Sequence, residues 1–287
     1  IARRMSLADC QSYNDYLSLL REKHEERASL VKDLLINVTN FFRDPEAFEW
    51  LENNILPELL ERLKANEDLR IWVAGCATGE EPYSLAILLL DLMERTEQHS
   101  DFKIYATDVD ERAIAVARKG IYPASIVEQV PQTLIDKYFV AVEGGIKYQI
   151  KPQVRDAVSF AVQNVTLDPP FSHIHLISCR NLLIYFKKAI QEKVLDAFYF
   201  ALEGDAFLLL GSSETVGSRV GKFRSINKKW RIYQKIPGQD KKRLFLERFH
   251  RSQANKGTVS PYLPQVPNRS RQRYDLSKAD RIRRSIL

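Results

Sequence analysis

A short turn at residues 75–81, Gly-Cys-Ala-Thr-Gly-Glu-Glu, suggests a binding site. It follows an apolar run and opens an apolar helix. Gly75 and Gly79 permit a tight turn close to a ligand, and Glu80 and Glu81 occupy the helix start. A pyrophosphate would be repelled there, and the lysine of a P-loop is missing. Unless this is an ordinary strand-to-helix turn, it favours a ligand with hydroxyls, an amine or a positive charge, such as S-adenosylmethionine.

A second acid, Asp108, ends the next apolar run, "FKIYATD". In a doubly wound sheet the carboxyl end of a strand faces the ligand crevice, where an acid can bind ribose hydroxyls. Asp108 could instead cap the following helix, "DERAIAVARK", but Asp110 is better placed for that role. We therefore predict that Asp108 binds a ribose.

The elements that must hold these acids alternate between apolar runs and helices from residue 70 onward. The runs are "RIWVA", "FKIYAT", "AVSFAV", "IHLISC" and "AFLLLG", and "KWRIYQKI" closes the series. This alternation predicts a parallel sheet with helices on both faces. A loop before the last run predicts that the final strand is antiparallel. The expected fold class is α/β, a Rossmann-like doubly wound sheet.

Three other segments complete the predicted organisation. Residues 1–60 form a helical N-terminal subdomain, in which Asp44 and Pro45 start a helix that Pro57 kinks. The main domain covers 61–245, with an inserted subdomain at about 121–155 whose sequence "KYFVAVEGGIKYQIKP" predicts a β-hairpin. Residues 246–287 form a basic linker or tail. The missing initiator Met suggests a piece cut from a longer chain, with the N-terminal subdomain truncated.

Charge and cysteine content limit the partners and the compartment. Residues 241–287 carry 13 Lys and Arg against 3 Asp and Glu, so the other 240 residues, with 30 basic and 34 acidic side chains, have a balance of −4. The overall charge of +6 therefore belongs to the tail, and we expect no nucleic-acid partner. Scattered cysteines, no signal peptide and no apolar run of about 18 residues predict a cytoplasmic protein without membrane insertion.

Four motifs, in family order and spacing, resemble the CheR-type chemotaxis methyltransferases, which esterify glutamate side chains on chemoreceptors. They are "NVTNFFR" (37–43), "GCATGEEPYS" (75–84), "ATDVDERAIAVAR" (106–118) and "SCRNLLIYF" (178–186). The wording "DPPFSHIHLISCRNLLIYF" and "LGSSETVG" is most similar to the methyltransferase domain of CheB/CheR multidomain fusions. The resemblance implies an S-adenosylmethionine-dependent protein-glutamate O-methyltransferase in a chemosensory pathway.

The resemblance also implies the roles of individual residues. Arg43 would orient the substrate carboxylate and Tyr185 would lie beside the transferring methyl group, although Arg43 could simply pair with a nearby acid and Tyr185 could belong to the core. The implied partner is a chemoreceptor-like protein with a methylatable glutamate, together with other domains of the same polypeptide. The implied cofactor-binding residues are Asn37, Thr39, Arg43, Gly75, Glu81, Asp108, Asn164, Val165 (through its backbone), Arg180 and Asn181.

The sequence departs from the family pattern at three places. Ser212 replaces a usual histidine, His175 replaces a usual aspartate, and the hairpin loop is short, which puts docking of a receptor-tail peptide in doubt. These departures keep open an alternative, a catalytically silent sensor or scaffold domain that binds S-adenosylmethionine or S-adenosylhomocysteine.

Two further readings are weaker. "DPPF" (168–171) resembles a motif of amino-methyltransferases that act on nucleic acids, but there it follows the fourth strand directly and here it precedes it. His173 and His175 would share one face of a strand. With no third ligand nearby in sequence, we expect no metal site.

Overall fold

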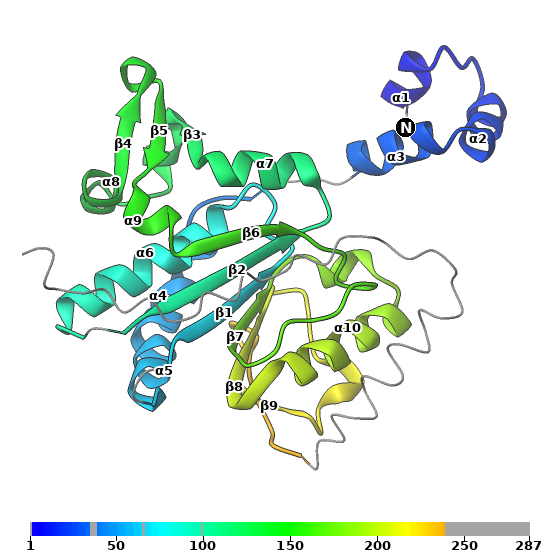
Figure 1. Ribbon diagram of the computed structural model, residues 1–287. Helices are drawn as coiled ribbons and strands as arrows, with labels where there is room; N and C mark the ends of the chain where they lie inside the picture. The colour runs from blue at the N-terminus through cyan, green and yellow to red at the C-terminus, as the bar shows by residue number, and fades with distance from the viewer. Residues whose placement is uncertain (1, 35–38, 65–66, 99, 239–287) are drawn as a thin grey trace, which may run out of the picture. The chain divides into compact units, whose positions relative to one another are not determined.

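The computed structural model describes residues 2–34, 39–64, 67–98 and 100–238 (Figure 1). Asn37 and the predicted tail at 246–287 lie outside the described residues. Within the described ranges, none of the helices combines the length and the apolar character that a membrane span needs.

A seven-stranded sheet forms the centre of the fold, in the order β6-β2-β1-β7-β8-β10-β9. The first five strands in this order are parallel, whereas β10 runs antiparallel to both β8 and β9. The predicted parallel sheet and antiparallel final strand are confirmed, and β9 is an addition. The strand bounds are β1 Leu69–Ala74, β2 Phe102–Asp108, β6 Val158–Val162, β7 Ile174–Cys179, β8 Leu202–Leu210, β9 Phe223–Asn227 and β10 Ile232–Lys235.

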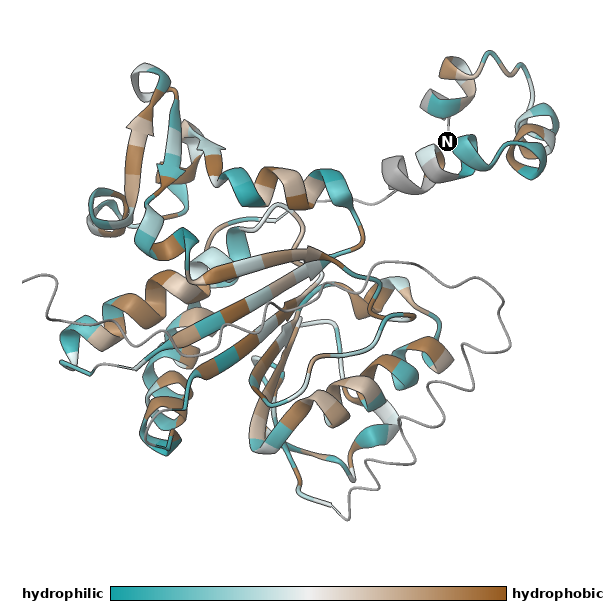
Figure 2. Cartoon of the chain, viewed as in Figure 1, coloured by the Kyte–Doolittle hydropathy of each residue, from teal (hydrophilic) through white to brown (hydrophobic). Residues whose placement is uncertain are grey.

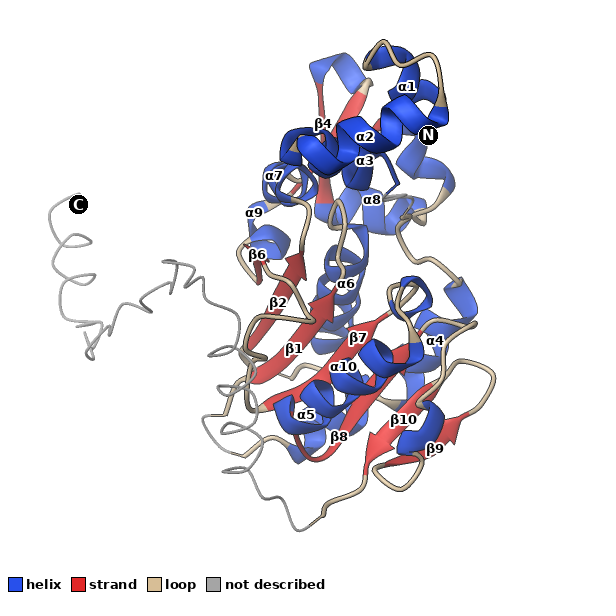
Figure 3. Cartoon of the chain, turned by 90° about the vertical axis from the view of Figure 1, so that its right-hand side faces the viewer, coloured by secondary structure: helices blue, strands red, loops and turns tan. Residues whose placement is uncertain are grey.

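Each face of this sheet is covered by helices because alternate strand residues point to opposite faces. Ile71 and Val73 pack on one face with α4 (Pro45–Asn54), α5 (Leu56–Arg62) and α6 (Glu80–Arg95). Trp72 and Ile177 pack on the other face with α10 (Lys188–Ala201). Figure 2 shows that the strands are mainly hydrophobic, and Figure 3 shows the strands and the helices around them. Both faces are buried, which explains the near-continuous apolar runs.

The helical N-terminal segment contains α1 (Ala2–Leu7), α2 (Tyr13–Glu22) and α3 (His24–Leu34). Glu26 of α3 joins them, since it accepts hydrogen bonds from Arg4 Nε at 3.0 Å and from Tyr16 Oη at 2.9 Å. The next predicted helix is interrupted as expected, because α4 ends at Asn54 and α5 begins at Leu56, one residue before Pro57.

The inserted subdomain is larger than the predicted hairpin. Strands β4 (Phe139–Val142) and β5 (Lys147–Ile150) form that hairpin around η2 (Glu143–Gly145), and β3 (Ile121–Pro123) adds a third strand beside β5. The helices η1 (Ala124–Glu128), α8 (Gln132–Tyr138) and α9 (Pro152–Arg155) accompany them. Phe41 contacts Tyr122 and Phe139 of this subdomain edge to face, with ring centroids 4.9 and 5.5 Å apart.

The turn between β1 and α6 depends on a glycine at residue 79. Gly79 has φ +96°, and a Cβ at this position would lie 2.8 Å from the Cβ of Ala117 and 3.1 Å from the hydroxyl of Tyr122. Ala117 belongs to α7 (Glu111–Lys119). The helix that carries Glu80 and Glu81 therefore begins where no side chain fits.

Replacing Gly79 with alanine separates this crowding from backbone strain. We expect Gly79→Ala to lower the free energy of unfolding by about 1–2 kcal/mol through the left-handed backbone and by about another 1–3 kcal/mol through overpacking. Gly144→Ala is the matched control, because Gly144 has φ +68° and no atom within 4 Å of its missing Cβ. Equal losses in urea unfolding would contradict the crowding argument.

Candidate functional site

Four parallel strands bring the predicted site residues to one edge of the sheet. Ala74, at the end of β1, is paired with Thr107 of β2, and Val73 is paired with Ser178 near the end of β7. Strand β6 ends beside β2, where Asp108 is paired with Val162. Because the strands are parallel, the segments that follow β1, β2, β6 and β7 all leave the sheet at this edge. This is the edge at which doubly wound sheets bind ligands.

Asp108 is fixed in place by the backbone around it. Its Oδ2 accepts a hydrogen bond from the N–H of Ala77 at 2.8 Å, and its Oδ1 accepts one from the N–H of Asp110 at 2.9 Å. Asp110 itself caps α7 by accepting from the N–H of Arg112 at 2.9 Å, as predicted. An ionised carboxylate has about four acceptor positions, so Asp108 can still accept hydrogen bonds from a ligand.

Gly75 completes the turn next to Asp108. The N–H groups of Gly75 and Cys76 both donate to the carbonyl of Thr107, at 2.8 and 3.0 Å. Gly75 has φ +78°, and a Cβ there would lie 3.0 Å from a methyl carbon of Leu182. The backbone of Gly75 therefore lies directly against Leu182 in the loop after β7, with no side chain between them.

The start of α6 carries negative charge close to this turn. Thr78 Oγ1 donates to the carboxylate of Glu80, at 2.9 and 2.7 Å from its two oxygens, and burial raises the pKa of Glu80. Burial also raises the pKa of the Cys76 thiol well above its ordinary range, and the charges of Asp108 and Glu81 raise it further. Cys76 is therefore a protonated thiol and a poor nucleophile. Because the acids around it carry negative charge, this part of the site favours a cationic ligand.

Arg180 joins this acidic turn to the segment before α4. Its guanidinium, with a side chain only 2% exposed, contacts Glu81 Oε2 at 3.3 Å and Asp44 Oδ2 at 2.5 Å. It also donates to the carbonyl of Arg43 at 2.8 Å, while Ser178 Oγ donates to Glu81 Oε1 at 2.6 Å. The sequence predicts a cofactor contact for Arg180; the structure places its guanidinium against protein groups. Ser178 and Asp44 were not predicted as part of the site, although Ser178 belongs to the "SCRN" motif.

The predicted helix start at Asp44 and Pro45 is confirmed, since α4 begins at Pro45, but the Asp44 side chain does not cap the helix. Asp44 stands at the N-cap position, but it is in the left-handed region and its side chain makes no capping hydrogen bond, because the carboxylate pairs with Arg180. Nearby, the N–H of Phe42 donates to Ser84 Oγ at 3.0 Å, and Ser84 Oγ donates to the carbonyl of Glu80 at 2.7 Å. Residues 42–44 are thus fixed to α6 and to the end of β7.

The remaining predicted residues lie around the same edge. Thr39 is partly exposed before this segment, and Tyr185 is 57% exposed in η3 (Leu183–Tyr185), just beyond β7. Asn164 follows β6, but its Oδ1 accepts from Thr166 N at 3.0 Å and Oγ1 at 2.7 Å. Val165 packs, partly buried, with the α10 side of the core.

Two buried carbonyl oxygens at this edge have no partner among the described residues. They are Oδ1 of Asn181, which follows β7, and Oε1 of Gln163, which follows β6. Buried polar atoms are nearly always hydrogen-bonded, so both oxygens are candidates to accept from a ligand. Gln163 was not predicted; its only sequence signal is that it is the first polar residue after the apolar run that ends β6.

Other clusters lie away from this edge or serve packing. His175 accepts from the N–H of Arg70 at 3.0 Å through Nδ1 and lies 3.3 Å from Glu67 through Nε2, while His173 pairs with Glu203. No group of three or more metal-ligating side chains occurs in the described part of the chain. Phe171 of "DPPF" stacks on Tyr105 with ring centroids 4.9 Å apart.

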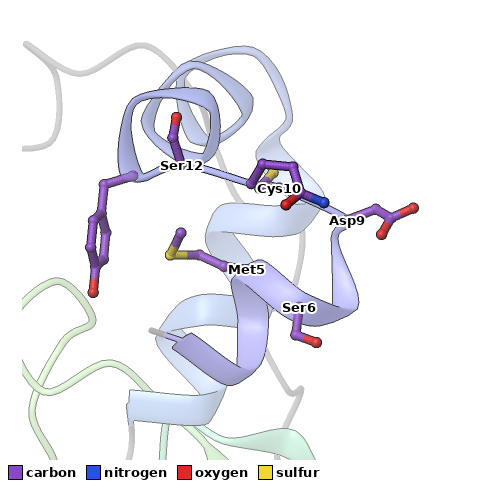
Figure 4. Close-up of a pocket in the computed structure, with 7 residues that line it drawn as sticks. Met5, Ser6, Asp9, Cys10 and Ser12 are labelled. Carbon is purple, nitrogen blue, oxygen red and sulfur yellow. The ribbon is translucent and has the colours of Figure 1, made fainter.

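An open pocket between α1 and α2 contains none of the predicted site residues (Figure 4). It is lined by Met5, Ser6, Asp9, Cys10, Gln11, Ser12 and Tyr13.

Comparison with known proteins gives consistent matches. The family model "CheR methyltransferase, SAM binding domain" matches residues 37–232. A 104.1 kDa protein of Rhodobacter capsulatus is 38% identical over 83% of this chain, but the match covers only 25% of that protein. A chemotaxis protein methyltransferase of Borreliella burgdorferi is 34% identical over 72% of this chain and 75% of its own length. A probable chemotaxis protein methyltransferase of Rhizobium etli is 37% identical, over 66% and 72% respectively.

Removing the charge of Glu80 tests the cost of burying it. Because burial raises the pKa of Glu80 above its ordinary value of 4.5, the folded chain takes up a proton before the unfolded chain as the pH falls. Stability therefore decreases as the pH rises above 4.5 through the folded pKa. We expect Glu80→Gln to be at least as stable as the wild type at pH 7, and the difference to vanish below pH 4.5. Urea unfolding across this range measures the difference, with Glu61→Gln, at an exposed position of α5, as the control for net charge. A pH-independent difference would contradict the expectation.

Substituting Arg180 tests whether the planar guanidinium group, which binds three partners, contributes to stability. A lysine keeps the charge but cannot reach Asp44, Glu81 and the Arg43 carbonyl together, so we expect Arg180→Lys to lower the free energy of unfolding by about 1–3 kcal/mol.

Arg219→Lys is the control for that experiment. Arg219 binds both oxygens of Asp196 at 2.8 Å, but its side chain is 26% exposed. We expect a smaller loss there, below about 1 kcal/mol. Equal losses in chemical denaturation would show that burial of Arg180 adds nothing.

Proposed function

Because the chain belongs to the CheR methyltransferase family, we propose that it transfers the methyl group of S-adenosylmethionine to glutamate side chains of a chemoreceptor-like protein, forming γ-glutamyl methyl esters. The observation that carries this proposal is Asp108, held by two backbone N–H groups at the carboxyl end of β2, beside a helix start that carries two further acids. A chemosensory role follows from the relatives named as chemotaxis methyltransferases.

The residues at this edge suit S-adenosylmethionine by their chemistry. Asp108 can accept from ribose hydroxyls, and the acids at the start of α6 favour the cationic amine and sulfonium. Gly75 leaves space that a Cβ would fill against Leu182. The unpartnered oxygens of Asn181 and Gln163 can accept from amino groups. The Arg180 guanidinium does contact Glu81 of this turn, but it is paired there with Glu81 and Asp44, so its charge is already balanced by carboxylates and does not favour a pyrophosphate.

Methyl transfer to a carboxylate makes few demands on the protein. When bound, S-adenosylmethionine supplies a methyl group activated by the sulfonium. A free glutamate has a pKa of roughly 4.3, so the nucleophile is ionised at neutral pH and needs no general base. The chain must exclude water and align the carboxylate. Arg43 is our candidate to orient it through charge-assisted hydrogen bonds, and Tyr185 is our candidate to lie beside the reacting groups.

The rest of the predicted set supports these roles. We propose that Glu81, aligned by Ser178 and Arg180, interacts with the cofactor, and that the guanidinium of Arg180 acts through Glu81 and the Arg43 backbone. Asn164 and the Val165 backbone are proposed to contact the cofactor from the end of β6. The other residues that we propose to contact the cofactor are Asn37, Thr39, Gly75 and Asn181.

The partner and the location are also proposals. The Rhodobacter relative is about four times as long as the matched segment, which supports further domains in the same polypeptide. We propose action in the cytoplasm on a chemoreceptor-like protein, without nucleic acid or membrane insertion. Docking of a receptor-tail peptide on the inserted subdomain is not part of the proposal.

A catalytically silent sensor is the second candidate, favoured by Ser212 in place of the usual histidine. Both candidates predict that the chain binds S-adenosylhomocysteine. They differ in turnover, because only an enzyme places base-labile methyl label on a receptor-like protein.

The first test is calorimetric titration with S-adenosylhomocysteine. We expect the wild type to bind and Asp108→Ala to lose at least about tenfold in affinity, since a hydrogen bond to a charged group contributes roughly 1.5–3 kcal/mol. Asp110→Ala is the matched control, because it removes a neighbouring acid that caps α7. A folded wild-type protein that does not bind would overturn the cofactor assignment.

Transfer of labelled methyl to a chemoreceptor fragment then separates the two candidates. The proposed enzyme yields label that alkali releases as methanol. Binding without any such label would leave the sensor.

A further inference from the structure

We infer that Glu214 is a positioning residue: its buried carboxylate sets the loop after β7 so that Asn181 faces the cofactor. This inference rests on the proposed function, because it takes Asn181 to contact S-adenosylmethionine. Glu214 was not among the predicted site residues, although it ends the "GSSE" segment that follows β8.

One carboxylate collects four backbone donors. Glu214, only 3% exposed, accepts through Oε2 from the N–H of Asn181 at 2.9 Å and of Gly211 at 2.7 Å. Its Oε1 accepts from Leu183 at 2.6 Å and from Ile184 at 3.3 Å. Because every contact is a donor, the site matches an acceptor-only carboxylate. Three of the four donors belong to the loop after β7.

This loop needs such an anchor because of its conformation. Asn181 has φ +59°, a left-handed backbone that costs free energy in a residue other than glycine and persists only when its surroundings enforce it. The anchored N–H groups of residues 181, 183 and 184 enforce it here. The same residue carries the buried Oδ1 without a partner in the described chain. The strained backbone thus holds an acceptor ready for a ligand.

Gly211 makes the arrangement possible from the other side. A Cβ on Gly211 would lie 2.8 Å from the backbone nitrogen of Asn181 and 2.8 Å from Oε2 of Glu214. Gly211 does not have a positive φ, so alanine is permitted by the backbone and excluded only by these contacts. Gly204 of β8 also lacks a positive φ, but nothing lies within 4 Å of its missing Cβ.

The glycine pair gives a matched experiment. Gly211→Ala removes no hydrogen-bonding group yet must displace the loop or Glu214, whereas Gly204→Ala leaves both in place. Glu214→Gln keeps the shape but turns an NH₂ group toward two backbone donors. We expect Gly211→Ala and Glu214→Gln each to weaken binding of S-adenosylhomocysteine by about tenfold or more in calorimetry, and Gly204→Ala to bind as the wild type does.

Hydrogen exchange distinguishes positioning from general stability. The amides of Asn181, Leu183 and Ile184 should exchange slowly in the wild type and faster in Glu214→Gln. Ile174→Val, which removes a buried methyl group at the opposite end of β7, should lower stability without changing either the affinity or these amides. Affinity that follows stability alone in all variants would overturn the inference.

The outcomes separate this inference from the proposed function. Wild-type protein that fails to bind would overturn both. Binding that Asp108→Ala weakens, but that Gly211→Ala and Glu214→Gln leave unchanged, would overturn the positioning role alone. Should one of these two variants fail to fold, the other decides.

Discussion

The site is assembled around one buried cation. The guanidinium of Arg180 has two carboxylate partners, from residues 44 and 81, and a carbonyl partner at residue 43. A buried charge without partners is strongly destabilising, so the segment before α4, the start of α6 and the end of β7 must all be in place together. Segments far apart in sequence are therefore coupled in one unit. Arg180, which is predicted to contact the cofactor, thus also holds together three segments that carry other predicted site residues.

Around that cation, the structure concentrates acids rather than phosphate-binding groups. A glycine turn after the first strand resembles nucleotide-binding turns in shape, but Glu80 and Glu81 reverse its electrostatic preference. The raised pKa of Cys76 reflects burial first and then the negative charges of Asp108, Glu81 and Glu80. Fold geometry alone would allow several cofactors at this edge. The negative charge of Glu80 and Glu81 favours a cationic cofactor, and the fixed carboxylate of Asp108 favours one with hydroxyl groups.

Much of this architecture could be predicted from sequence because it rests on local patterns. Strands that are buried on both faces appear in the sequence as apolar runs. The cap of α7 was predictable because Asp110 and the residue it bonds, Arg112, are neighbours in the sequence. Strand β9 could not be predicted, since only Phe223 of its five residues is buried. The helix start at Asp44 was predicted, but the pairing of its side chain with Arg180 could not be, because the two residues lie 136 positions apart. Glu214 was not predicted for the same reason: three of its four donors belong to the loop after β7, and a lone glutamate in a polar segment gives no indication that it is buried.

Through Tyr122, the inserted subdomain contacts segments that form the site. Its hydroxyl donates to the carbonyl of Thr78 at 2.8 Å, inside the glycine turn, and its ring packs against Phe41, two residues before Arg43. Both contacts reach segments that form the site. Removing Tyr122 would therefore expose Phe41 and take a hydrogen bond from the turn. The central sheet and its insert thus depend on each other for the geometry of the site, and neither can be treated as a separate module.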